Sequence, residues 1–60
     1  MGSYFAMAFF PSFENQYCVR NLKLRGFKTE KAARQAIERA KLDGYVKKLG
    51  QSVPVWSNVK

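Results

Sequence analysis

The chain has 60 residues, a formal net charge of +7, a single cysteine and no histidine. A chain of this length forms one domain, residues 1–60, and buries only about 60 % of the surface that its unfolded form exposes. The cysteine count excludes an internal disulfide, and the Cys and His content is too small for the usual zinc site. Because Cys18 lies in an apolar run, we expect a buried, inert thiol. With no histidine to act as its base, four scattered acidic residues and no Gly-rich phosphate loop, we expect no enzyme, no metal and no cofactor.

The N-terminal part predicts two antiparallel strands. Residues 4–10 are apolar on both faces of an alternating pattern, and residues 17–25 follow a loop at residues 11–16. The alternation in the second strand changes phase at Asn21. Because a one-residue slip sends side chains to the wrong face, this change predicts a β-bulge at Asn21, or a tight bend that divides the segment into two short strands.

Residues 30–42 predict a helix. Thr29 is a good N-cap, and Gly44 is placed to end the helix as its C′ residue. Four apolar positions recur at helical spacing and form one stripe: Ala33, Ala36, Ile37 and Ala40. Because three of these four residues are alanine, the helix can approach a sheet closely, and bulky strand residues fill the core.

The C-terminal part predicts further strand material at residues 45–48 and 53–56. Pro54 cannot donate to a strand ladder, so the last strand is expected at an edge. We expect Trp56 in the core, with an exposed interaction anchor as the alternative. The predicted fold is therefore α+β: a small antiparallel sheet of two N-terminal strands plus a C-terminal strand or hairpin, packed against a single helix in the order ββαβ(β). Nine aromatic residues favour a folded monomer or homodimer over a disordered tail.

The positive charge is concentrated in one part of the chain. Residues 20–48 contain ten of the eleven Lys and Arg residues and carry a net +7. Such a field attracts polyanions, nucleic acid first, and a solvated helix face is the alternative reading. Aromatic rings can stack on exposed bases, Asn and Arg side chains can bind base edges, and Lys and Arg bind phosphates. The N-terminus of a helix also binds anions. The candidate nucleic-acid-binding residues on these grounds are Tyr17, Asn21, Lys23 and Arg25, on one sheet face if a bulge permits, with Lys28 and Lys31 at the helix start.

Residues 25–33, Arg-Gly-Phe-Lys-Thr-Glu-Lys-Ala-Ala, follow a predicted strand. This segment resembles the R-G-F-x-T-x-x-x-A junction of AP2-like domains, the arm-type DNA-binding domains of phage integrases. The resemblance covers about residues 17–42 and leaves residues 45–60 without a counterpart. In that family a small sheet packs on one helix and enters the major groove, which implies that Arg20, Lys23 and Arg25 face DNA. With no catalytic domain in the 60 residues, we expect a stand-alone binding domain rather than an integrase.

The expected function is nucleic-acid binding, duplex DNA before RNA, by a small accessory or regulatory protein of phage or bacterial type. The alternative is a protein-interaction module that binds or inhibits a host protein through an aromatic and basic surface. We expect no membrane partner, because the apolar run at residues 4–10 is far shorter than the ~20 residues of a membrane span. One free cysteine suits a reducing compartment, here the bacterial or phage-infected cytoplasm.

Overall fold

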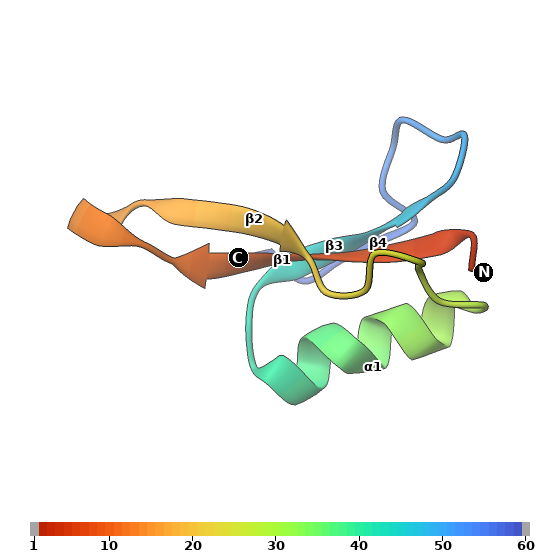
Figure 1. The fold of residues 1–60 in the computed structure, drawn as a ribbon, viewed down its shortest axis with the longest axis horizontal. Coiled ribbons are helices and arrows are strands. Elements are labelled where there is room, and N and C mark those ends of the chain that lie inside the picture. Colours follow the sequence, from red (N-terminus) through yellow and green to blue (C-terminus); the bar gives the residue numbers. More distant parts are fainter. Residues whose placement is uncertain (1, 60) are drawn as a thin grey trace.

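A computed structural model describes residues 2–59 of the chain. These residues form a single antiparallel sheet with the strand order β2-β1-β3-β4, and α1 lies across one of its faces (Figure 1). The arrangement confirms the predicted α+β fold with two N-terminal strands, one helix and C-terminal strand material. The elements in chain order are β1 (Tyr4–Pro11), the 3-10 turn η1 (Phe13–Asn15), β2 (Tyr17–Asn21), α1 (Glu30–Ala40), β3 (Gly44–Lys48) and β4 (Trp56–Ser57).

The core lies between α1 and the two central strands. Ala6, Ala33, Ile37 and Val46 are fully buried in one cluster. The partly buried residues packed around this cluster are Tyr4, Leu22, Phe27, Ala36, Val55 and Trp56. The alanines thus allow the close helix–sheet approach that the apolar stripe predicts. Ala40, the last residue of α1, is exposed, so the stripe is shorter than predicted.

The two ends of α1 differ in how well the sequence predicts them. The predicted N-cap is confirmed, because Thr29 Oγ1 accepts a hydrogen bond from the Ala32 N–H at 3.1 Å. At the other end the helix stops at Ala40, where Lys41 adopts a left-handed conformation with φ 56° and caps the helix. The prediction that Gly44 is the C′ residue is wrong. Gly44 begins β3, where a Cβ atom would overlap the Met7 carbonyl oxygen.

The predicted second strand ends at Asn21, and a turn follows. Asn21 Oδ1 accepts from the Lys23 N–H at 3.2 Å, and the Gly26 N–H donates to the Lys23 carbonyl at 2.9 Å. The chain then returns to β1 and forms a single bridge between Phe27 and Tyr4. The predicted tight bend at Asn21 is therefore confirmed, and the second half of the segment is reduced to one bridge. This turn accounts for the change of phase in the sequence.

The C-terminal segment meets the sheet at the free edge of β3, as predicted. The strand is shorter and later than predicted, with only Trp56 and Ser57 in β4, while Pro54 lies in the loop before it. Trp56 is half-buried and packs against the core, and the Arg34 guanidinium carbon lies 5.9 Å from its ring centroid. The core interpretation of Trp56 therefore holds.

The outer ends of β1 and β2, together with η1, project past the end of α1 (Figure 1). We call this segment, residues 9–19, the arm. The ladder between β1 and β3 ends at the pair Ala8–Gly44, so the last residues of β1 pair with β2. Cys18, predicted to be buried, is exposed. The reason is that an apolar strand residue is buried only where another layer covers it, and α1 does not extend over the arm.

Candidate nucleic-acid interface

Three cationic side chains gather around one depression at the start of α1. Lys23 and Arg25 come from the turn after β2, and Lys28 directly precedes the N-cap residue of α1. Gly26, buried between them with φ 75°, lets this turn pass close to the first residues of β1. The depression has a volume of about 500 Å³. We call it the basic hollow, and its lining consists of Gly2, Lys23, Arg25, Gly26, Phe27, Lys28 and Ala32.

The helix start adds positive potential to the basic hollow. The first amide N–H groups of a helix have no intrahelical acceptor, and the helix dipole places partial positive charge at this end. The Thr29 side chain caps the Ala32 N–H, so the earlier amides of the first turn are not satisfied by this cap. Lys31, next to the lining residue Ala32, is exposed on this first turn. The dipole of α1 and the lysine and arginine side chains of the hollow therefore add positive potential at the same end of the molecule.

None of these cations has a carboxylate closer than 4 Å within residues 2–59, although Glu30 lies in the same first turn of α1. Within residues 2–59, the ion pair closer than 4 Å is Arg34 with Glu30, at 3.8 Å, and it lies on the helix surface. Lys23 is positioned instead by an aromatic ring, because its Nζ lies 5.3 Å from the centroid of Phe27. The charge of the basic hollow therefore remains available to an external anion.

The remaining predicted site residues lie elsewhere. Tyr17 and Asn21 share the face of β2 that points away from α1, opposite Pro11 and Met7 in the ladder. Arg20 points to the other face, with its guanidinium carbon 5.9 Å from the ring centroid of Phe10. Tyr17 and Asn21 therefore share one sheet face as predicted, but this face does not include Lys23 and Arg25. Arg20, which the resemblance to AP2-like domains places with Lys23 and Arg25, is on the opposite face of the strand. Because β2 ends at Asn21, the following cations belong to a turn and not to the sheet.

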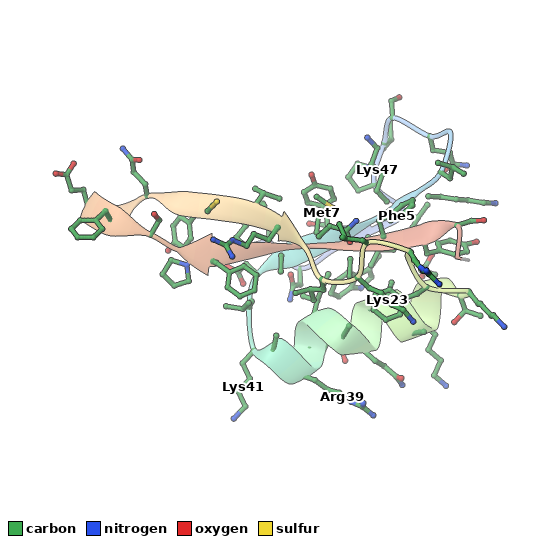
Figure 2. The ribbon with its side chains drawn as sticks, in the orientation of Figure 1. Phe5, Met7, Lys23, Arg39, Lys41 and Lys47 are labelled. Carbon is green, nitrogen blue, oxygen red and sulfur yellow. The ribbon has the colours of Figure 1, made fainter. Side chains whose placement is uncertain are left out.

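The uncovered face of the sheet carries a second feature, which the sequence analysis did not single out. Phe5, Met7 and Lys47 lie on the side of the sheet away from α1 (Figure 2). On the same face, Phe9 packs edge-to-face against Tyr45 with ring centroids 6.0 Å apart. A depression of about 440 Å³ adjoins this face and is lined by Phe5, Lys47, Lys48, Leu49, Gly50, Gln51 and Ser52. The sequence of β1 could have predicted this exposed apolar face, because both faces of β1 are apolar and a single helix can cover only one of them.

No helix within residues 2–59 has the length and apolar character needed to cross a membrane. No protein-family model matches the chain, and no curated protein and no solved structure matches it either. The resemblance to AP2-like domains therefore stays a prediction. Any function for this chain has to be inferred from the geometry of its own surfaces.

Proposed function

We propose that the protein binds nucleic acid, duplex DNA before RNA, by holding backbone phosphates at the basic hollow. The observation that carries this proposal is the convergence of Lys23, Arg25 and Lys28 on one depression. Lys31 is exposed on the adjoining first turn of α1, and none of these four cations has an ion pair closer than 4 Å among residues 2–59. In this role the protein is a small accessory or regulatory factor of phage or bacterial type.

Phosphate binding at this site uses three kinds of donor. Lysine ammonium groups supply compact charge, the Arg25 guanidinium can present two parallel N–H groups to one phosphate, and the helix start supplies backbone N–H groups. Each phosphate neutralised releases condensed counterions, which makes binding favourable and dependent on salt. Such contacts fix the position of a duplex without reading its sequence. The net charge of +7 also steers the protein to a polyanion.

The aromatic content of the hollow favours a duplex over a single strand. Binding of unpaired bases relies on aromatic rings that are free to stack. Phe27 is the aromatic residue that lines the hollow, and it is half-buried against the core with Lys23 over its face. The hollow therefore offers charge without a stacking platform, which suits a ligand whose bases are already stacked in pairs.

A titration by fluorescence anisotropy tests this function. Labelled DNA duplex, DNA single strand and RNA duplex are each titrated with protein at several salt concentrations. With three cations lining the hollow and Lys31 on the adjoining helix turn as a fourth contact, we expect log K on duplex DNA to fall linearly with log salt with a slope of about −3 to −4. Absence of binding at physiological salt, or a slope near zero, would show that the positive charge only solvates the surface.

The uncovered face of the sheet, on the side away from α1, favours a second candidate function, binding of a host protein through an aromatic and basic surface. Phe5, Lys47 and Lys48 line its depression, which combines apolar area with positive charge. The test is a pull-down from bacterial lysate with and without nuclease, using Lys47→Glu as the variant. Trp56 is unsuitable for this test, because it packs against the core. Capture that survives nuclease and is lost in Lys47→Glu supports this function, whereas loss of every captured protein after nuclease refutes it.

A further inference from the structure

The arm exposes apolar side chains that no other part of residues 2–59 covers. Phe13 is 88 % exposed, Tyr17 69 % and Val19 45 %, and Cys18 is exposed as well. A two-stranded hairpin without a covering layer is marginally stable in water. Tyr17 and Val19 share one face of β2, and exposed apolar groups gathered on one segment of a small protein favour an interaction site there. The arm is therefore a candidate contact surface.

The surface area of the molecule indicates how large that contact is. A compact monomer of 6.9 kDa exposes about 4,000 Å². This chain exposes 4698 Å², an excess of about 700 Å². A standard protein–protein interface buries about 800 Å² on each partner. The excess is thus close to one side of an ordinary interface.

The edge of β2 shows how a partner can attach. β2 is an outer strand of the sheet, so one row of its backbone N–H and C=O groups faces solvent. Natural edge strands are commonly protected by charged side chains, proline or a bulge. β2 (Tyr17–Asn21) has one charged residue, Arg20, contains no proline and pairs with β1 in unbroken register. Its outer edge is therefore free to add another strand.

We propose that the occupant of the arm is a second copy of this chain, joined by antiparallel pairing of the two β2 strands about a two-fold axis. With Val19 on the axis, Tyr17 faces Asn21 of the other copy and Cys18 faces Arg20. No two like charges are then directly opposite each other, and the two Arg20 residues are diagonal neighbours on one face. Two-fold contacts of this kind, in which one patch meets itself, are the commonest in soluble oligomers.

The distribution of charge favours a second copy over an acidic partner. Residues 4–22 contain Glu14 and Arg20 as their charged residues and are neutral overall, although the chain carries +7. The arm lies at one end of the long, 34 Å axis, and the turn that carries the basic hollow lies at the other (Figure 1). Two copies can therefore join at their neutral ends with little repulsion, since charges are screened beyond about 8 Å at physiological salt. An acidic partner would be drawn to the opposite end.

Sedimentation velocity across a wide range of protein concentration tests this pairing. We expect the wild-type chain to reach twice its 6.9 kDa mass. Val19→Lys places two like charges on the axis and should raise the dimer dissociation constant at least about 100-fold. The matched control is Val53→Lys, at a residue that is 70 % exposed in the loop before β4 and should leave the dimer intact. Circular dichroism confirms that both variants remain folded.

The results separate the alternatives. A wild-type chain that remains monomeric at every concentration overturns the proposal and assigns the arm to a different occupant. A dimer that survives Val19→Lys, or that Val53→Lys weakens equally, places the interface elsewhere and also overturns it. A nitroxide on Cys18, the single cysteine, supplies a second measurement. Its spectrum should show dipolar broadening in the dimer, and a dimer without broadening refutes pairing through β2.

Discussion

Substitution of helix alanines by leucine tests how α1 packs on the sheet. Three alanines on this helix differ in burial: Ala33 is fully buried, Ala36 is half-buried and Ala40 is exposed. Leucine is bulkier than alanine, and extra volume in a filled core displaces its neighbours at a cost of about 1–3 kcal/mol. The intrinsic helix preference for alanine over leucine is small and is the same at all three sites. Differences among the three variants therefore report packing.

We expect Ala33→Leu to lose about 3 kcal/mol of unfolding free energy, Ala36→Leu about 1 kcal/mol, and Ala40→Leu less than about 0.5 kcal/mol. For a small domain each kcal/mol corresponds to about 4–8 °C in Tm, so Ala33→Leu should lower Tm by roughly 12–24 °C. The assay is thermal and urea unfolding followed by the fluorescence of Trp56, the single tryptophan, which is half-buried against the core. Equal Tm values for the three variants, or the largest loss at Ala40, would refute the assigned helix face.

One substitution that replaces a glycine and one that introduces a glycine test where α1 ends and β3 begins. Gly44→Ala places a Cβ against the Met7 carbonyl oxygen, so the free energy of unfolding measured in urea should fall by about 2 kcal/mol or more. An unchanged urea midpoint would mean that β3 does not approach β1 so closely. Lys41→Gly relieves a left-handed conformation that costs an L-residue about 1–2 kcal/mol, partly offset by the greater freedom of the unfolded chain. The same assay should show a gain of about 0.5–1 kcal/mol, and a loss would contradict the capping role of Lys41.

Local patterns in the sequence predict most of the fold. The N-cap at Thr29 and the edge position of the last strand depend on residues close together in the chain, and both are confirmed. The apolar stripe of α1 is confirmed at Ala33, Ala36 and Ile37 but not at Ala40, which is exposed. Gly44 shows where such reasoning fails. A glycine after a helix suits a C′ position as well as a strand start, and the deciding contact, with Met7, comes from a residue far away in the sequence.

The surfaces were less predictable than the fold. The cluster of cations was evident from composition, but the face that each one occupies depends on the residue at which β2 ends. Two residues beyond that end, Lys23 already belongs to a turn, and Arg20 within the strand points to the opposite face from Asn21. The exposure of Cys18 depends on the length of α1 relative to the arm, which no pattern within β2 contains.

The central claim is that the basic hollow, and not the total charge, binds phosphate. The most direct test compares two variants that each remove one lysine and one arginine, Lys23→Gln with Arg25→Gln and Arg39→Gln with Lys41→Gln. Arg39 and Lys41 lie at the C-terminal end of α1 and do not line the basic hollow, whereas Lys23 and Arg25 do.

The measurement is the salt dependence of duplex DNA binding, read as the slope of log K against log salt. We expect the first pair to flatten this slope by about 1.8, because each lost phosphate contact is worth about 0.9, and the second pair to leave it nearly unchanged. Equal flattening by both pairs, or a larger effect of the helix pair, would contradict the claim.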